Sequence, residues 1–130
     1  MKIMICEGDE VKAKVLTGLL NVYKYKLITL TKSGDFFRQV QTHKPAVIIL
    51  NESFYHKSGQ DFINRLRTDP VSSRTPVIII QNENGTGENN IPLEFNADGL
   101  TEMLKEPLKI KYLRHCVDRW TTFRSLHIKQ

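Results

Sequence analysis

The sequence Pro45-Ala46-Val47-Ile48-Ile49-Leu50-Asn51 predicts a β-strand that is buried on both faces. Residues 46–50 are all apolar, three of them are β-branched, and a polar residue and a glycine-containing loop follow. Strands of this kind occupy the centre of parallel sheets, and in an open α/β sheet the binding site lies beyond the carboxyl ends of the central strands. Asn51, at the end of this strand, is therefore the first candidate functional residue.

Length and composition indicate one globular domain that spans residues 1–130. Hydrophobic residues make up 40% of the 130 residues and charged residues 25%, which is ordinary for a soluble protein. No apolar run approaches the roughly 20 residues of a membrane-spanning helix. The apolar start, residues 1–6, is short and is followed at once by Glu7, unlike a signal peptide. We therefore expect a cytoplasmic protein with no membrane partner.

The residue types that form metal and catalytic sites are scattered along the chain. Cys6 and Cys116 have no metal-ligand spacing and are expected to be reduced, buried thiols. The four histidines have no serine or cysteine partner at the spacing of a hydrolytic triad. Gly85-Thr86-Gly87 lacks the lysine and hydroxyl residue of a phosphate-binding loop. The sequence therefore favours a protein that is not an enzyme.

Strand patterns and helix patterns alternate along the chain. Apolar, β-branched runs predict strands and apolar residues at helical spacing predict helices, the first of which has Asp9 as its expected N-cap and Val15 in its apolar stripe. This alternation predicts an α/β protein with five βα units, a parallel sheet and helices on both faces. The strands are expected at 2–6, 26–31, 45–51, 76–81 and 100–104, and the helices at 10–22, 36–44, 60–68 and 110–123, with any helix in 82–98 short or frayed.

Polar segments that follow the strands should meet at the carboxyl edge of this sheet. A cluster of carboxylates at this edge would form a Mg²⁺ site, because this ion prefers several oxygen ligands in near-octahedral geometry. Only Glu7 is a firm candidate ligand. The segments are Glu7-Gly8-Asp9, Asn51, Gln81 and Lys105-Glu106-Pro107.

These motifs resemble the receiver domains of two-component response regulators, and the resemblance covers about residues 2–125. It implies a flavodoxin-like (βα)5 three-layer sandwich whose five-stranded parallel sheet has the strand order 2-1-3-4-5. It also implies a part in two-component or phosphorelay signal transduction. The matching segments are 2–9 for the first strand and acidic pair, 45–51 with Gly59 for the phosphorylated segment, 76–81 for the fourth strand, and 99–108 for the fifth.

The positions that carry phosphorylation in that family differ in this chain. Asn51 stands where the family has its phosphorylated aspartate, and a neutral amide is not a phosphoryl acceptor. Gly8 replaces the second acidic residue, Gln81 a threonine or serine, and Met103 the switch aromatic. Glu106 stands where the family has lysine, so a negative charge lies where phosphate would need a positive one.

The resemblance therefore implies a pseudo-receiver that keeps the scaffold and has lost phosphotransfer. Neighbouring strand residues point to opposite faces, so Lys105 could replace the missing lysine only after a one-residue slip that would also misplace the core side chains. We expect a polar cluster in which the Asn51 amide donates to Glu7 or Glu106, with no cofactor. The alternatives are a weak cation site at Glu7, Asn51 and Glu106, and a receiver still phosphorylated through a rearranged site.

The formal charge of +5 lies in the last part of the chain, where residues 105–130 hold seven basic and two acidic residues. The resemblance implies a sensor kinase, a phosphotransfer protein, an output protein or a second copy as partner. The expected face is built from any helix in 82–98, the strand at 100–104 and the final helix, and a nucleic acid is the less favoured alternative. Its candidate basic residues are Lys105, Lys109, Lys111, Arg114 and Arg119.

Overall fold

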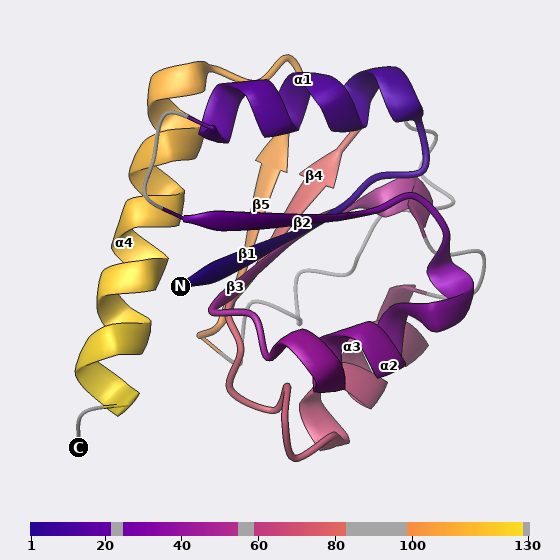
Figure 1. The fold of residues 1–130 in the computed structure, drawn as a ribbon, viewed down its shortest axis with the longest axis vertical. Helices are drawn as coiled ribbons and strands as arrows, with labels where there is room; N and C mark the ends of the chain where they lie inside the picture. The colour runs from indigo at the N-terminus through magenta and orange to yellow at the C-terminus, as the bar shows by residue number, and fades with distance from the viewer. Residues whose placement is uncertain (22–24, 55–58, 83–98, 129–130) are drawn as a thin grey trace.

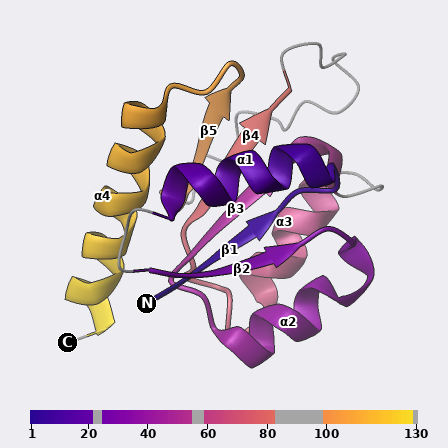
Figure 2. The same ribbon diagram turned by 45° about the horizontal axis from the view of Figure 1, so that its top comes forward.

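The protein contains one five-stranded sheet in which all neighbouring strands run parallel (Figures 1 and 2). The computed structural model describes residues 1–21, 25–54, 59–82 and 99–128. The strand order is β2-β1-β3-β4-β5, which confirms the predicted order. The strands are β1 (Lys2–Cys6), β2 (Lys26–Leu30), β3 (Val47–Asn51), β4 (Val77–Gln81) and β5 (Thr101–Lys105).

Helices cover both faces of the sheet, so the described chain forms three layers (Figures 1 and 2). One face carries α1 (Glu10–Leu20) and α4 (Ile110–Ile128), and the other carries α2 (Phe36–His43) and α3 (Gly59–Thr68). Two short 3₁₀ turns, Ser33–Asp35 and Glu52–Phe54, precede α2 and follow β3. The short helix predicted within 82–98 falls outside the described residues, except for Asn82 directly after β4.

Strand β3 is central, and all five of its residues are buried. Val47 and Ile49 pack into the core beneath α1 and α4, whereas Ile48 and Leu50 pack into the core beneath α2 and α3. This alternation follows from the two-residue period of a strand, and burial on both faces explains why the run is apolar throughout. The strand therefore brings Asn51 to the carboxyl edge between β1 and β4.

Helix α1 begins as predicted, because the Asp9 carboxylate accepts hydrogen bonds from the backbone N–H groups of Val11 (2.9 Å) and Lys12 (3.1 Å). The prediction that Val15 belongs to its buried stripe is wrong, since this side chain is 55% exposed. The face that meets the sheet is centred on Ala13, Leu16 and Leu20, at helical spacing, and Val15 lies outside it. The helix ends at Leu20.

Cys6 and Cys116 are buried free thiols, as predicted. Burial raises the pKa of both, and the nearby carboxylate of Glu102 adds to the effect at Cys116. A raised pKa keeps a thiol protonated and unreactive. Among the described helices, none combines the length and the apolar character needed to span a membrane.

Candidate functional site

Asn51 is buried at the end of β3, and both ends of its side-chain amide are engaged. Its Oδ1 accepts hydrogen bonds from the backbone N–H (2.9 Å) and the hydroxyl (2.7 Å) of Ser53, while its Nδ2 donates to Asn82 Oδ1 (2.9 Å). The prediction that this amide donates to Glu7 or Glu106 is therefore wrong. Asn51 pairs with Ile80 in the sheet. Asn82 comes two residues after Ile80, so its side chain lies on the same side of the sheet as that of Asn51 and can accept the hydrogen bond from the amide.

Lys12, in the first turns of α1, extends this network to the far side of the site. Its ammonium lies 3.3 Å from Asn82 Oδ1 and 3.3 Å from Glu106 Oε1. The Lys12 side chain is 43% exposed and that of Glu106 is 20% exposed, so the ion pair is only partly screened by water. Asn82 Oδ1 thus accepts from two donors, and the network joins α1 to the ends of β3, β4 and β5.

Glu52 is a buried carboxylate next to Asn51, and it holds the backbone of the same asparagine. Its Oε1 accepts a hydrogen bond from the backbone N–H of Asn82 (2.8 Å). Its Oε2 is buried and has no hydrogen-bond partner in the described part of the chain. Asn51 therefore holds the side chain of Asn82, and Glu52 holds its main chain.

Glu7, at the end of β1, is buried close to the ion pair. Its Oε1 accepts a hydrogen bond from the backbone N–H of Asp9 (3.0 Å), and its Oε2 finds no hydrogen-bond partner among the described residues. Burial raises the pKa of the Glu7 carboxyl. The Asp9 N–H and the Lys12 ammonium oppose this shift, while the carboxylates of Asp9 and Glu106 add to it.

Replacing Glu7 with glutamine is expected to change how stability depends on pH. Because the folded-state pKa of Glu7 is raised, the folded protein holds this proton more tightly than the unfolded chain does. The wild-type free energy of unfolding should therefore fall as the pH rises from the unfolded-state pKa of glutamate, about 4.3, to the raised folded-state pKa of Glu7. The fall is about 1.4 kcal/mol for each pH unit between these two pKa values. Glutamine cannot titrate, so Glu7→Gln should gain stability relative to wild type over this window.

Urea unfolding of both proteins between about pH 4 and pH 7 measures this difference. Val15→Ala is the control, since Val15 is exposed on α1, carries no titratable group and should leave the pH profile of stability unchanged. A stability difference between Glu7→Gln and wild type that stays constant with pH would show that Glu7 does not titrate differently in the folded protein.

Solved structures of bacterial receiver domains superpose on nearly the whole chain. A response regulator receiver domain from Clostridium thermocellum gives a TM-score of 0.79 at 19% identity and covers 96% of this chain and 97% of its own. The signal receiver domain of a DNA-binding response regulator from Colwellia psychrerythraea 34H gives 0.77 at 22% identity, with 92% and 96% covered. The chain has the fold of a response regulator receiver domain. Chemotaxis protein CheY4 of Vibrio cholerae gives 0.73 at 19% identity, with 91% and 96% covered.

Sequence similarity to curated proteins is limited to one part of much longer chains. Protein RcaC of Microchaete diplosiphon is 28% identical over 79 residues, which are 61% of this chain and 12% of RcaC. The 3',5'-cyclic-nucleotide phosphodiesterase regA of Dictyostelium discoideum is 25% identical over 83 residues, or 62% of this chain and 10% of regA. No family model matches the sequence. The receiver fold therefore rests on the structural likeness.

In the described part of the chain, no side-chain hydrogen bond joins the other predicted positions to this network. Gly8 is exposed, and a Cβ added there would meet only the Thr31 carbonyl oxygen, at 3.8 Å. Gln81 uses its backbone oxygen to accept from the N–H of Glu106 (2.9 Å). Met103 packs, partly buried, against the core beneath α2 and α3. Lys105 is exposed, and the ion pair of Glu106 is with Lys12.

Four residues of the network are not among the positions predicted from the sequence, namely Lys12, Glu52, Ser53 and Asn82. Each lies one to three residues after a predicted position. Glu52 follows Asn51, Asn82 follows Gln81, and Lys12 comes three residues after Asp9. A search that extended one residue beyond each strand end would have found two of them, but their partners depend on the folded structure.

The arrangement fits a divalent cation poorly. In the described part of the chain, no three acidic, histidine or cysteine side chains lie close enough together to hold a metal ion. The one oxygen that Asn51 could offer already accepts two hydrogen bonds from Ser53. The Lys12 ammonium, next to Glu106, places a positive charge where a cation would otherwise be attracted.

The predicted basic face divides into two groups of residues. Lys105, Lys109 and Lys111 are exposed around the turn that leads into α4. The two arginines serve the fold instead. Arg114 donates from Nε to the carbonyl oxygen of Leu19 (3.1 Å), and Arg119 pairs with the Glu102 carboxylate on β5. Of these five residues, the three lysines are therefore the better candidates for contact with a partner.

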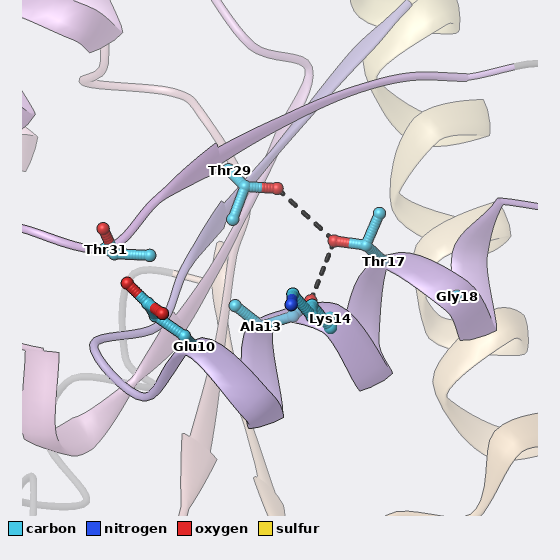
Figure 3. A pocket seen from close by; sticks show the side chains of 7 residues that line it. All are labelled: Glu10, Ala13, Lys14, Thr17, Gly18, Thr29 and Thr31. Atoms are coloured by element: carbon cyan, nitrogen blue, oxygen red, sulfur yellow. Dashed lines mark hydrogen bonds between the residues drawn. The ribbon is translucent and has the colours of Figure 1, made fainter.

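A surface pocket of about 510 Å³ lies between α1 and the edge strand β2, apart from the network around Asn51 (Figure 3). The hydroxyl of Thr17 donates to the Ala13 carbonyl oxygen (2.8 Å) and lies 3.4 Å from the hydroxyl of Thr29. The contact between the two hydroxyls joins the helix to the strand across the pocket, whereas the bond to Ala13 lies within α1. Its lining comprises Glu10, Ala13, Lys14, Thr17, Gly18, Thr29 and Thr31.

Proposed function

We propose that this chain is an atypical receiver domain of two-component or phosphorelay signalling that acts by binding another protein, independently of phosphorylation. The receiver fold supports the signalling class. The observation that carries the rest of the proposal is Asn51, an amide at the edge position where a receiver domain needs a reactive carboxylate, held by Ser53 on one side and by Asn82 on the other.

The chemistry of the site supports the loss of phosphotransfer. A carboxylate oxygen can attack a phosphoryl donor and form an acyl phosphate, whereas the nitrogen lone pair of an amide is delocalised and its oxygen is a weak nucleophile. Phosphoryl transfer also needs positive charge around the transferred group. Glu7 and Glu106 supply negative charge there, and the nearby Lys12 ammonium is already paired with Glu106.

The proposal also includes the loss of the Mg²⁺ site that phosphotransfer needs. Phosphoryl transfer to a receiver aspartate needs Mg²⁺, and the residues at this edge do not suit it, since Gly8 contributes no side-chain ligand and the Asn51 oxygen faces Ser53. We therefore expect no cofactor. Titration of the protein with Mg²⁺ should leave the fluorescence of Trp120 unchanged.

The proposed activity is protein binding rather than catalysis. Candidate partners are a sensor kinase, a phosphotransfer protein, an output protein or a second copy of the chain. The proposed face includes β5 and the start of α4, where Lys105, Lys109 and Lys111 are exposed together with Ile110 and Tyr112. Exposed apolar side chains among lysines are suited to a protein surface that carries acidic groups.

Incubation with Mg²⁺ and acetyl phosphate, followed by intact mass measurement, tests the loss of phosphotransfer. We expect no gain of a phosphoryl group in the wild-type protein. Asn51→Asp alone should also remain unlabelled, because Gly8 and Glu106 still differ from a working site. A receiver domain with an intact aspartate, treated in parallel, controls for the donor. A magnesium-dependent gain of one phosphoryl group by the wild type would overturn the proposal.

A further inference from the structure

A continuous chain of polar contacts crosses the carboxyl edge of the sheet. It runs from the Asn51 amide to Asn82 Oδ1, from there to the Lys12 ammonium, and on to the Glu106 carboxylate. The three contacts measure 2.9, 3.3 and 3.3 Å. The first joins β3 to the residue after β4, and the other two join α1 to that residue and to the turn after β5.

The charges in this chain differ from those implied by the receiver resemblance at two strand ends. The resemblance places a lysine after the fifth strand and an acidic residue at the third, whereas this chain has Glu106 after β5 and a neutral amide at the end of β3. The positive charge comes instead from α1, through Lys12. The edge therefore contains its own cation, which pairs with the acidic residue after β5 without any added group.

We propose that Lys12 is a positioning residue that fixes this edge in one conformation, by tying Asn82 and Glu106 to α1. We name these three residues the Lys12 latch. The inference rests on the proposed function, since it supplies the means by which the edge would stay fixed without phosphorylation. A receiver with a phosphorylation switch needs two conformations at this edge, and the latch favours a single one.

The charges around Lys12 support its role in holding Glu106 in place. Glu7 is buried beside the latch. The negative charge of Glu106 raises the pKa of the Glu7 carboxyl, so the two carboxylates repel each other. Lys12 offsets this repulsion because its ammonium attracts both. Without that ammonium, the repulsion would favour movement of Glu106 and its turn away from Glu7, since Glu106 lies in a connecting turn and Glu7 is anchored in the buried end of β1.

The latch also connects the site to the proposed partner face. Glu106 lies between Lys105 and Lys109, and α4 begins at Ile110. Asn82 is the residue that follows β4, and its main chain is held in addition by Glu52. Opening the latch would therefore loosen the turn after β5 and Asn82 together.

Hydrogen exchange of two backbone amides measures the latch directly. The N–H of Asn82 donates to Glu52, and the N–H of Glu106 donates to the Gln81 carbonyl oxygen. In Lys12→Met, which keeps the aliphatic stem and removes the charge, both amides should exchange about 5- to 10-fold faster. The N–H of Ile48, which donates to Pro76 in the centre of the sheet, should be unaffected and reports global opening.

Two further variants make the test specific. Lys14→Met removes an exposed lysine from the same helix, one that lines the α1–β2 pocket, and should leave both amides unchanged. Glu106→Gln breaks the same ion pair but also removes the repulsion from Glu7, so it should speed exchange less than Lys12→Met does, and the double variant should exchange no faster than Lys12→Met. Unchanged exchange in Lys12→Met, or additive effects in the double variant, would overturn the latch. Neither result would bear on the proposed loss of phosphotransfer, which the acetyl phosphate experiment tests separately.

Discussion

Replacing Phe36 with alanine is expected to lower the free energy of unfolding by about 3–5 kcal/mol. Phe36 is the first residue of α2 and is fully buried in the core beneath α2 and α3. Its ring centroid lies 4.7 Å from that of Phe62, 5.0 Å from Phe37 and 6.0 Å from Phe54. Truncation would remove the ring that all three contact and leave a cavity that α2, packed on the sheet, cannot fill.

Urea unfolding followed by far-ultraviolet circular dichroism measures the loss. Phe36→Leu retains most of the volume and should cost only about 1.5 kcal/mol. Val15→Ala is the surface control, since Val15 is exposed on α1, and should change stability by less than about 0.5 kcal/mol. A loss below about 2 kcal/mol in Phe36→Ala would mean that the core can close around the missing ring, contrary to its dense packing.

Strands β1, β3 and β4 were predictable because each is a short apolar run with a clear end, whereas β5, with the sequence TEMLK, has a weaker strand pattern. The observed β3, Val47–Asn51, lies within the predicted 45–51, and β5 at Thr101–Lys105 differs from the predicted 100–104 by one residue. The first helix shows the limit of this reasoning. An apolar pattern can be drawn through Val15, but packing on the sheet selects the face of Ala13 and Leu16, and this choice depends on the angle of the helix in the folded protein.

The position of the candidate site was also predictable, whereas its internal bonding was not. Glu7, Asn51 and Glu106 follow strands, and parallel strands bring their carboxyl ends to one edge. The partners of these residues are remote in sequence. Asn51 bonds a residue 31 positions away, and Lys12 pairs with a residue 94 positions away. Contacts of this kind follow from side-chain conformations in the folded structure, and no local sequence pattern marks them.

Arg67 is a second case of long-range bonding that the sequence does not mark. It lies in α3, and its guanidinium donates four hydrogen bonds to described residues of two other segments. Nη1 donates to the carbonyl oxygens of Ser72 (3.2 Å) and Thr75 (2.7 Å), in the connection to β4. Nη2 donates to the carbonyl oxygen of Leu100 (3.2 Å) and the hydroxyl of Thr101 (3.0 Å), at the start of β5. One side chain therefore joins the segments that lead into two neighbouring strands.

Replacing Arg67 with methionine is expected to lower the free energy of unfolding by about 2–4 kcal/mol. Methionine keeps much of the aliphatic stem but leaves backbone carbonyl groups of the part-buried Ser72–Thr75 connection without their charged donor. Arg67→Lys should fall between wild type and Arg67→Met, because one ammonium cannot reproduce a planar group that reaches both segments at once. Urea unfolding of the three proteins measures the series.

Arg65→Met is the matched control for Arg67→Met, because it makes the same substitution two residues earlier in α3. The Arg65 guanidinium is exposed and lies 3.9 Å from the centroid of the Phe37 ring, a contact worth about 0.5–1 kcal/mol. If Arg67→Met proved no more destabilising than Arg65→Met, the four hydrogen bonds would add nothing beyond a surface contact. The expected excess instead indicates that Arg67 helps to hold together the segments that lead into β4 and β5, the strands whose opposite ends precede Asn82 and Glu106.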